Sequence, residues 1–461
     1  MALMKSISGI RGTIGGIPGD NLTPIDIVKF TAAYGMMLLE QQTGKKVVVG
    51  RDGRMSGEMV RSLVVNTLQG LGLDVVDLGL STTPTVEMAV VFEQAAGGII
   101  LTASHNPRQW NALKLLNEKG EFISAEAGRR VLQSAEDLSF RFAEVDQLGT
   151  YTQNDQLLQQ HIEAILRHPL VAKQAIAEKK FKVVVDAINS SGAIAVPALL
   201  NQLGVTDVVV LNAAMHGDFA HNPEPLTENL TELCATVVKE QAHLGIAVDP
   251  DVDRLCFVSE DGTLFGEEYT LVAVADYVLQ QQKGNTVSNL SSTRALRDVT
   301  EKHGGTYYAS AVGEVNVVAK MKQVNAVIGG EGNGGIIDPQ LHYGRDALVG
   351  IGLFLSHLAK TGLTTAQLRK TYPDYYMGKK KVDLPRSTNV QEVLDKVKEQ
   401  FSSYPVNTED GVKVEFQQGW VHLRPSNTEP IIRIYSEADS PEAAEQLAET
   451  FIKKIESLMG I

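Results

Sequence analysis

Residues 97–107, Gly-Gly-Ile-Ile-Leu-Thr-Ala-Ser-His-Asn-Pro, give the clearest sign of the fold. The run begins without a polar residue, which is typical of a strand buried on both faces of a sheet. The small polar residues that follow, together with Pro107, predict a surface turn at the end of this strand. Rigid strands often hold functional loops, so Ser104 is a candidate nucleophile or phosphoryl carrier. The alternative is a turn that only ends a strand.

Three carboxylates follow a second apolar run. Residues 245–254 read Gly-Ile-Ala-Val-Asp-Pro-Asp-Val-Asp-Arg, with Asp249, Asp251 and Asp253 at alternate positions and Pro250 bending the chain between the first two. Alternating carboxylates on a bent loop can converge on one hard cation. Oxygen ligands favour Mg²⁺ or Ca²⁺ over zinc or copper, and a site with few protein ligands and room for phosphate oxygens favours Mg²⁺.

A third segment offers groups that bind phosphate. Residues 424–430, Arg-Pro-Ser-Asn-Thr-Glu-Pro, lie between two strand-like runs, 420–423 and 431–435. They supply a guanidinium, two hydroxyls, an amide and turn N–H groups, which are the donors that a phosphate dianion requires. A nucleophile, a cation site and an anion-binding loop together indicate phosphoryl transfer.

These motifs resemble those of the α-D-phosphohexomutases, the family of phosphoglucomutase, phosphomannomutase and phosphoglucosamine mutase, and the resemblance spans nearly the whole chain. Residues 102–107 are similar to the family's phosphoserine loop and residues 249–254 to its metal loop. Residues 330–335 are similar to its sugar-specificity loop and residues 424–430 to its phosphate loop. Ser-Gly-Ile-Arg-Gly at residues 8–12 is similar to the opening motif, whose arginine lies in the active site.

The resemblance implies roles for individual residues. Ser104 would carry a phosphoryl group, primed by a sugar bisphosphate, and Mg²⁺ would bind Ser104, Asp249, Asp251 and Asp253. The catalytic residues that we expect are Arg11, Ser104, His105, Lys114 and Arg254. Among them Lys114, ten residues after the serine, matches the family's general base, although a surface lysine with an ordinary pKa is usually only solvated. We expect the sugar and its phosphate to contact Ser310, Gly313, Glu331, Asn333, Arg424, Ser426, Asn427, Thr428 and Arg433.

The sugar-specificity loop departs from the best-known pattern. The phosphomannomutase and phosphoglucosamine mutase loops of bacteria end in Ser-Gly-His, whereas residues 333–335 read Asn-Gly-Gly here. The family's histidine is therefore missing, and His342, seven residues on, is a candidate substitute. Glu331 and Asn333 can still bind two neighbouring ring hydroxyls. A family turn, Thr-x-Val-Gly, has serine for threonine at residues 310–313.

We therefore expect a phosphohexose mutase, an isomerase that interconverts hexose 6-phosphate and hexose 1-phosphate through a phosphoserine enzyme and a bisphosphate intermediate. Resemblance to the aminosugar branch favours a phosphoglucosamine mutase, and a phosphomannomutase or phosphoglucomutase of broader specificity is the alternative. Remote alternatives are a phosphatase with Asp249 as nucleophile and a non-catalytic sugar-phosphate sensor. An EF-hand is disfavoured because Arg254 stands where its loop needs glycine.

Composition narrows the class of protein. With 461 residues the chain is too long for one core and predicts three or four domains. The net charge of −13 argues against a nucleic-acid partner. Only Cys234 and Cys256 occur, without metal-ligand spacing, which favours free thiols in a reducing compartment. No run is as long and apolar as a membrane span, and no signal peptide is recognisable, so we expect a cytoplasmic enzyme without a membrane partner, monomeric or homodimeric.

A strand–helix–strand pattern occurs three times, each time with glycine before the second strand, at residues 46–78, 181–211 and 286–309. After residue 372 strands and helices follow one another as in an α+β domain, whose last helix opens with Ser440-Pro441-Glu442. We predict an α/β protein in which three related mixed α/β domains and a C-terminal α+β domain surround a central cleft. The domains would comprise residues 1–152 with the phosphoserine loop, 153–256 with the metal loop, 257–372 with the sugar-specificity loop and 373–461 with the phosphate-binding loop.

Overall fold

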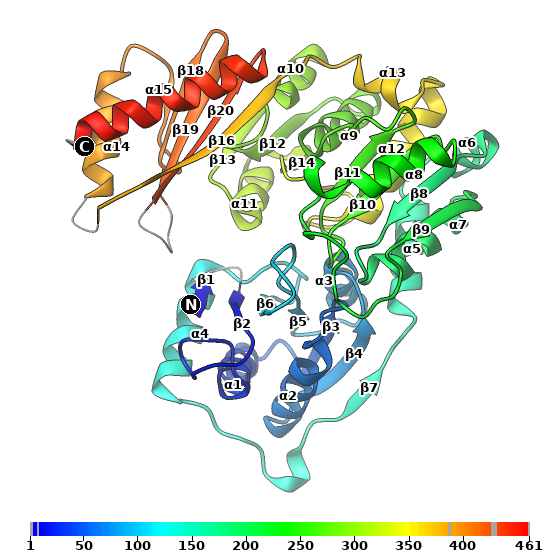
Figure 1. Cartoon of the computed structure of the whole chain (residues 1–461). Helices are drawn as coiled ribbons and strands as arrows, with labels where there is room; N and C mark the ends of the chain where they lie inside the picture. The colour runs from blue at the N-terminus through cyan, green and yellow to red at the C-terminus, as the bar shows by residue number, and fades with distance from the viewer. Residues whose placement is uncertain (1–2, 7–8, 386–388, 426–430, 460–461) are drawn as a thin grey trace.

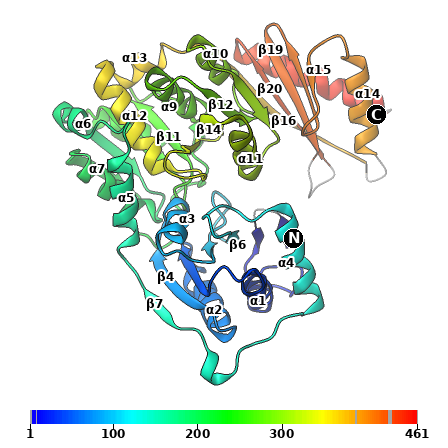
Figure 2. The same cartoon turned by 180° about the vertical axis from the view of Figure 1, so that it is seen from behind.

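The chain folds into three α/β domains and a C-terminal α+β domain, as the sequence predicts. The computed structural model describes residues 3–6, 9–385, 389–425 and 431–459. Domain I, blue to cyan in Figure 1, lies below domains II, III and IV, which follow one another in an arc above it. Figure 2 shows the same arrangement from behind.

Domain I contains a seven-stranded sheet in the order β1-β2-β6-β5-β3-β4-β7. Helices α1, α2 and α4 pack on one face and α3 on the other. Thr23 and Asp26 form a capping box that begins α1. The elements are β1 (Met4–Ser6), β2 (Gly9–Thr13), α1 (Pro24–Gln41), β3 (Lys46–Arg51), α2 (Gly57–Gly70), β4 (Asp74–Leu80), α3 (Thr83–Phe92), β5 (Gly97–Leu101), β6 (Trp110–Leu116), α4 (Ala125–Asp137), the 3₁₀ turn η1 (Val145–Gln147) and β7 (Tyr151–Gln153).

Domain II contains a four-stranded sheet in the order β11-β10-β8-β9, in which only β11 is antiparallel to its neighbour. Its strands are almost entirely apolar, as expected for a sheet covered on both faces. The elements are α5 (Leu157–Arg167), α6 (Lys173–Lys179), β8 (Lys182–Asp186), α7 (Gly192–Gln202), β9 (Asp207–Leu211), η2 (Thr227–Asn229), α8 (Thr231–Lys239), β10 (Leu244–Val248) and β11 (Leu255–Ser259).

Domain III repeats this design, with the order β13-β12-β14-β15 and an antiparallel β15. It shares one hydrophobic core with domain II, in which Phe257 and Phe354 stack with ring centroids 3.7 Å apart. The elements are α9 (Glu267–Gln281), β12 (Asn285–Asn289), α10 (Ala295–Lys302), β13 (Tyr307–Ser310), α11 (Glu314–Val324), β14 (Ala326–Glu331), β15 (Gly335–Ile337), α12 (Ala347–Thr361) and α13 (Thr365–Arg369).

The first three domains have the same strand order over four strands. In domain I the four strands run β6-β5-β3-β4, in domain II β11-β10-β8-β9, and in domain III β15-β14-β12-β13. In each of them a parallel strand is followed by a loop and an antiparallel strand: β5 and β6, β10 and β11, β14 and β15. The first of these three loops contains residues 102–107, which we call the phosphoserine-like loop. The second contains residues 249–254, the metal-like loop, and the third lies within residues 330–335, the sugar-like loop.

Domain IV has an antiparallel five-stranded sheet in the order β16-β20-β19-β18-β17, with α14 and α15 packed on it. Ser440 begins the last helix, and its side chain accepts a 3.1 Å hydrogen bond from the N–H of Ala443. The elements are β16 (Tyr376–Asp383), α14 (Val390–Gln400), β17 (Val406–Asn407), β18 (Val412–Phe416), β19 (Gly419–Pro425), β20 (Ile431–Ala438) and α15 (Pro441–Met459).

Two expected domain boundaries fall inside strands. The boundary at residue 152 lies in β7, which pairs with β4 of domain I. The boundary at residue 256 lies in β11, which completes the sheet of domain II. Both strands join an existing sheet edge through backbone hydrogen bonds, and such pairing leaves little trace in the residue types.

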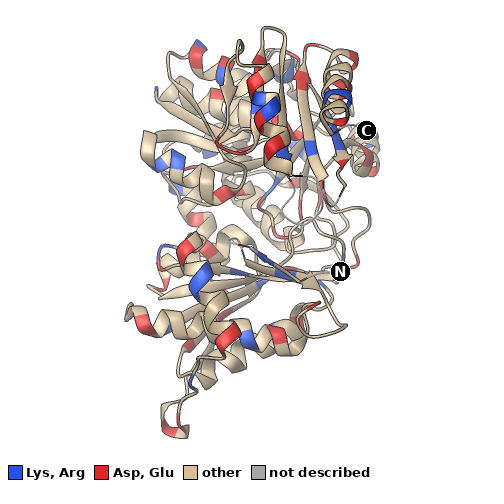
Figure 3. Cartoon of the chain, turned by 90° about the vertical axis from the view of Figure 1, so that its left-hand side faces the viewer, with Lys and Arg blue, Asp and Glu red and all other residues tan. Residues whose placement is uncertain are grey.

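Charged residues of both signs are mixed along the chain, and the two cysteines form no disulfide. Lys and Arg are interspersed with Asp and Glu along the elements that Figure 3 shows. Both cysteines are free, and Cys256 is buried. Among the residues that the structure describes, no helix is long and apolar enough to span a membrane.

Candidate active site

Ser104 lies in the loop between β5 and β6, at the end of a fully buried strand. Its backbone is left-handed, with φ of 49°, and its N–H donates to the Thr102 hydroxyl at 2.9 Å. Only 3% of Ser104 is exposed, and its hydroxyl donates to Asp249 Oδ2 at 2.7 Å. A non-glycine residue held in this region stores backbone strain, which is common at functional sites. The nucleophile candidate therefore points at the candidate metal loop of another domain.

The fully buried Arg54 holds this loop, and no sequence pattern indicated that role. It follows β3 and forms an ion pair with Asp52 at 3.0 Å. Its guanidinium donates to four carbonyl oxygens of the Ser104 loop, those of Ser104, Asn106, Pro107 and Trp110. One rigid cation therefore fixes the path of the whole loop.

Arg11 and His105, two of the predicted catalytic residues, lie at the Ser104 loop. Arg11 Nη1 donates to Asn106 Oδ1 at 2.7 Å, and His105 Nδ1 lies 3.4 Å from Ser104 Oγ. Burial, followed by the positive charges of Arg254 and Arg11, lowers the pKa of His105 to about 2. The ring is therefore neutral at physiological pH.

Asp249, Asp251 and Asp253 converge, with one carboxylate oxygen of each within 4.8 Å of the others. Asp249 Oδ1 accepts the N–H groups of Asp253 and Arg254, both at 3.1 Å. Burial and the charges of the other two aspartates raise the pKa of Asp249 well above its ordinary value. Asp251 Oδ1 and Asp253 Oδ1 are buried without a hydrogen-bond partner. Two orphaned oxygens beside a third carboxylate and a serine hydroxyl fit a hard divalent cation.

Lys114 is not the surface lysine that its residue type suggests. It is 3% exposed, and its Nζ lies 2.7 Å from Asp251 Oδ2 and 3.3 Å from Asp253 Oδ2. Burial alone would lower the pKa of Lys114, but the two carboxylates outweigh it and raise the pKa above the ordinary value. In this arrangement Lys114 is an ammonium group, which cannot accept a proton.

Arg254 ends the metal-like loop and is mostly buried. Its Nη1 forms an ion pair with Glu224 Oε1 at 3.3 Å, and its Nε is buried without a hydrogen-bond partner. The guanidinium therefore retains capacity to bind an anion next to Asp253.

Arg345, which the sequence did not single out, joins the metal-like loop to the sugar-like loop. It lies before α12 and contacts three carboxylates at 2.7, 2.9 and 3.0 Å: Asp253, Glu331 and Glu314. Its only sequence signal is an Arg-Asp pair just before a helix, which is common in proteins without such a role.

Glu331 contacts one of the other expected sugar-contacting residues of domain III, Gly313. Its Oε1 accepts from Asn289 Nδ2 at 2.8 Å and from the N–H of Gly313 at 3.1 Å. Ser310 ends β13, and Asn333 Oδ1 accepts the N–H of Gly335 at 3.2 Å.

The sugar-like loop also touches the metal-like loop directly. The carbonyl of Gly334 accepts the N–H of Leu255 at 3.0 Å, and Gly334 has a φ of +85°. A Cβ there would lie 2.3 Å from the carbonyl oxygen of Leu255, so the close approach requires glycine.

His342 is not placed as a substitute for the missing loop histidine. Its Nδ1 lies 3.4 Å from Glu87 Oε2 and its Nε2 lies 3.3 Å from Asp346 Oδ2. Both ring nitrogens thus face carboxylates of a buried cluster, and no hydrogen bond or ion pair among the described residues joins His342 to Glu331 or Asn333.

The expected phosphate-binding residues of domain IV are only partly described. Arg424 and Arg433 lie opposite each other on β19 and β20, and Arg424 Nε is 2.7 Å from Asp410 Oδ2. Asp410 also accepts the N–H of Val312, which links domain IV to domain III. Ser426, Asn427 and Thr428 lie outside the described residues.

Four family models match the chain in order. They are described as phosphoglucomutase/phosphomannomutase alpha/beta/alpha domain I at residues 4–142, domain II at residues 159–262, domain III at residues 266–376 and the C-terminal domain at residues 380–454.

Known proteins are similar over the whole length. A phosphoglucomutase/phosphomannomutase of Thermococcus kodakarensis is 36% identical over 455 residues, which cover 97% of this chain and 98% of that protein. A probable phosphoglucosamine mutase of Methanopyrus kandleri is 34% identical over 450 residues, which cover 96% of each. The crystal structure of a phosphoglucomutase/phosphomannomutase family protein from Burkholderia thailandensis superposes with a TM-score of 0.85 at 27% identity, covering 98% of both chains.

Proposed function

The chain belongs to the phosphoglucomutase/phosphomannomutase family of isomerases, and from that membership we propose that it interconverts hexose 1-phosphates and hexose 6-phosphates through a phosphoryl group carried on Ser104. The observation that carries this proposal is the 2.7 Å hydrogen bond from Ser104 Oγ to Asp249, inside a cluster of three convergent aspartates. A serine hydroxyl that points into a cation site is placed for phosphoryl transfer rather than for ending a strand.

Ser104 and the three aspartates would hold Mg²⁺, which supplies charge neutralisation for the phosphoryl oxygens when bound. The unpartnered oxygens of Asp251 and Asp253 support this assignment. Arg254 and Arg11 would bind the remaining phosphoryl oxygens, because the Arg11 guanidinium lies at the Ser104 loop and Arg254, which directly follows the aspartates in the chain, has a buried Nε without a hydrogen-bond partner.

In the proposed transfer a hydroxyl of the bound sugar attacks the phosphorus of phosphoserine. The new bond joins that oxygen to phosphorus, the bond from phosphorus to Ser104 Oγ breaks, and the hydroxyl proton passes to a base. The bisphosphate then turns over and returns its other phosphoryl group to Ser104, so that no net phosphate is consumed.

Lys114 is the proposed base, provided that its ammonium first loses a proton. The carboxylates of Asp251 and Asp253 hold that proton by electrostatic attraction. A divalent cation held by these carboxylates would share their attraction and would lower the pKa of Lys114 toward the range in which an amine accepts a proton.

For the sugar we propose glucosamine phosphate, with a broader phosphomannomutase or phosphoglucomutase as the alternative. Support comes from the relative in Methanopyrus kandleri, whose name gives that activity as probable. The relative in Thermococcus kodakarensis carries the broader name and favours the alternative. The phosphate that does not react would bind to residues of domain IV, namely Arg424, Ser426, Asn427, Thr428 and Arg433.

The first experiment measures intact mass before and after incubation with a hexose bisphosphate and Mg²⁺. We expect an added phosphate on the wild-type chain, localised to Ser104, and none on Ser104→Ala. Coupled assays then compare turnover of glucosamine, glucose and mannose 1-phosphates. Release of free phosphate without isomerisation would support the phosphatase alternative, and absence of both turnover and phosphorylation would support the sensor.

The free thiols support a reducing, cytoplasmic location. We propose a monomer or homodimer with hexose phosphate as its substrate and without nucleic-acid or membrane partners. Light scattering of the purified protein tests the first statement.

A further inference from the structure

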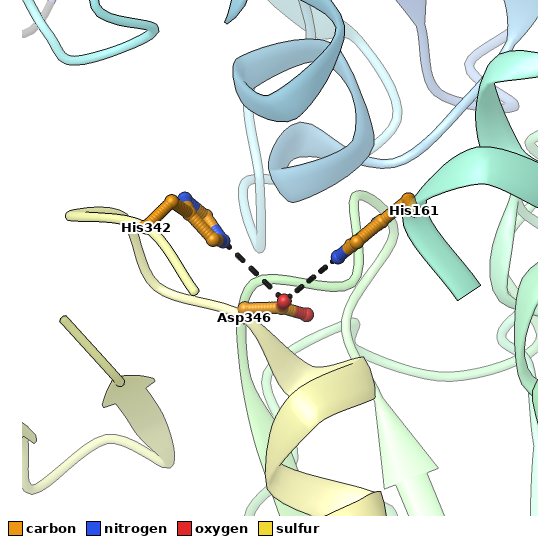
Figure 4. A group of neighbouring side chains, drawn as sticks. All are labelled: His161, His342 and Asp346. Atoms are coloured by element: carbon orange, nitrogen blue, oxygen red, sulfur yellow. Dashed lines mark hydrogen bonds and ion pairs between the residues drawn. The ribbon is translucent and has the colours of Figure 1, made fainter. Parts of the chain in front are cut away.

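A second group of possible metal ligands lies where domains I, II and III meet. His161 comes from α5, His342 from the loop after β15, and Asp346 is the residue that caps α12. Figure 4 shows the two rings approaching one oxygen of Asp346 from opposite sides. The distances to Asp346 Oδ2 are 3.0 Å from His161 Nε2 and 3.3 Å from His342 Nε2.

The outer nitrogen of each ring has an oxygen partner on α3 of domain I. Thr85 Oγ1 lies 3.0 Å from His161 Nδ1, and Glu87 Oε2 lies 3.4 Å from His342 Nδ1. Histidine ligands of metal ions almost always have such a partner, which fixes the ring and leaves the other nitrogen free for the metal. Asp346 Oδ1 is held separately by the N–H groups of Leu348 and Val349.

The neighbouring Glu87 is a buried carboxylate that lacks a hydrogen-bond donor, which indicates that a cation could bind in this cluster. It is 1% exposed, and its Oε2 faces His342 Nδ1 at 3.4 Å, but neither of its carboxylate oxygens accepts a hydrogen bond. A buried carboxylate without a partner is costly, and Asp346 adds a second carboxylate to the same cluster. A divalent cation between the two imidazoles and Asp346 would balance both carboxylates.

We propose that His161, His342 and Asp346 form a transition-metal site, with Zn²⁺ as the ion that fits best. Tetrahedral Zn²⁺ at about 2.0–2.1 Å from its ligands holds the ligand atoms roughly 3.3 Å apart, close to the distances around Asp346 Oδ2. Imidazole ligands select zinc-like ions over Mg²⁺. The ion joins domain II to domain III directly and domain I through the partners on α3.

The site is distinct from the three aspartates, which offer oxygen ligands alone. It also differs from another histidine pair in the chain, of which His357 is buried and His303 is partly exposed. His303 and His357 contact different oxygens of Asp276, at 2.7 and 3.7 Å, and Tyr372 donates to the second oxygen. That arrangement is a satisfied hydrogen-bond network, and it supplies a matched control.

The test titrates the metal-stripped full-length protein with Co²⁺, a spectroscopic substitute for Zn²⁺, in excess Mg²⁺ that occupies the aspartates. We expect one ion per chain, a visible absorption band typical of nitrogen-ligated tetrahedral cobalt, and displacement of cobalt by Zn²⁺. His161→Gln and His342→Gln should lose the band, whereas His303→Gln should keep it. Zn²⁺ should raise the melting temperature of the wild type and of His303→Gln only.

Circular dichroism of the metal-free variants reports whether they fold. If a variant does not fold, the wild-type titration alone decides the question. A wild type without saturable cobalt or zinc binding in excess Mg²⁺ would overturn the proposal, and so would a band that survives in both folded variants. Mutase turnover is not a readout here, so failure of this site and failure of the proposed function are separate outcomes.

Discussion

The Ser104 hydroxyl faces the aspartates whether or not it carries a phosphoryl group in the proposed reaction. It donates to Asp249 when it carries no phosphate, and the same position would present a phosphoryl group to the aspartates after phosphorylation. The left-handed backbone and the bond from its N–H to Thr102 hold the side chain in place, so little reorganisation is needed between the two states.

Ser104→Ala should lower kcat by at least about a thousandfold and leave binding of hexose phosphate nearly unchanged, because the hydroxyl carries the phosphoryl group and does not dock the substrate. Coupled turnover and calorimetric binding measure the two effects. Ser259→Ala is the control, since Ser259 is equally buried at the end of β11 and its Oγ has no hydrogen-bond partner. Comparable turnover in both variants would contradict the assignment.

Lys114→Met should destabilise the metal-free protein by about 3–5 kcal/mol, because it leaves Asp251 and Asp253 buried without their ammonium partner. Mg²⁺ should then raise the melting temperature of the variant more than that of the wild type, since the cation takes over the lost charge.

The control for this substitution is Lys413→Met. Lys413 is also buried, but it donates to the carbonyl of Leu290 and lies over the ring of Trp420, away from the aspartates. Its melting temperature should respond to Mg²⁺ as the wild type does. An equal response in Lys114→Met would show that Lys114 and the metal do not share a site.

At the scale of elements, each of the first three domains uses one hairpin for one functional loop. The sequence predicted these loops because apolar strands end in unusual polar runs, as before Ser104 and Asp249. It also predicted the repeated strand–helix–strand units, although it did not show that the hairpins occupy the same place in the three sheets. That correspondence depends on strand pairing, which single residues do not encode.

The residues that the sequence missed act through tertiary contacts. Arg54 and Arg345 are separated along the chain from the loops that they hold, and Glu87 lies on a helix whose spacing reveals only burial. The residue type of Lys114 suggested solvation, whereas the fold buries it beside two carboxylates. Local patterns thus identified the candidate substrate-binding groups better than the residues that position them.

Arg54→Lys tests how the β5–β6 loop is positioned. Lysine keeps the charge, but its single ammonium group cannot donate to as many of these carbonyl oxygens as the planar guanidinium does. We therefore expect kcat to fall by about tenfold to a hundredfold with little change in KM. Arg61→Lys on α2 is a matched control, because its partners Glu58 and Asp77 lie away from the loop. Equal losses in the two variants would indicate a general effect on domain I.

Glu268, on α9, makes the region of the sugar-like loop sensitive to pH. Burial raises its pKa to about 8 from 4.5, and its carboxyl lies against Gly332. Between these values the folded state binds a proton that the unfolded state releases. Stability should therefore fall as pH rises from about 4.5 to 8, by up to about 1.4 kcal/mol per pH unit from this group.

Glu268→Gln, which imitates the protonated side chain, should remove this dependence. Its melting temperature should exceed that of the wild type by an amount that grows between pH 5 and pH 8.5. Glu267→Gln is the control, since Glu267 is partly exposed and pairs with Lys379 at 3.6 Å. A constant difference across the pH range would show that Glu268 does not titrate in the folded protein.

At the scale of the whole molecule, the proposed reaction needs two separated sites. Phosphoryl transfer is assigned to residues of domains I, II and III, whereas the phosphate that does not react is assigned to domain IV. The net charge of −13 repels a sugar phosphate at long range, so binding must depend on local cations. Arg424 is such a cation, held at the interface between domains III and IV by Asp410.

Arg424→Gln should raise KM for hexose phosphates by about tenfold to a hundredfold while kcat falls less, because the lost interaction binds a phosphate that takes no part in bond breaking. Steady-state kinetics over a range of substrate concentrations gives both constants. Arg297→Gln removes a comparable arginine, which pairs with Glu415 at 2.7 Å across the same pair of domains. If Arg297→Gln raises KM equally, the effect comes from the interface between domains III and IV. If only Arg424→Gln raises KM, domain IV binds the phosphate that does not react, away from Ser104.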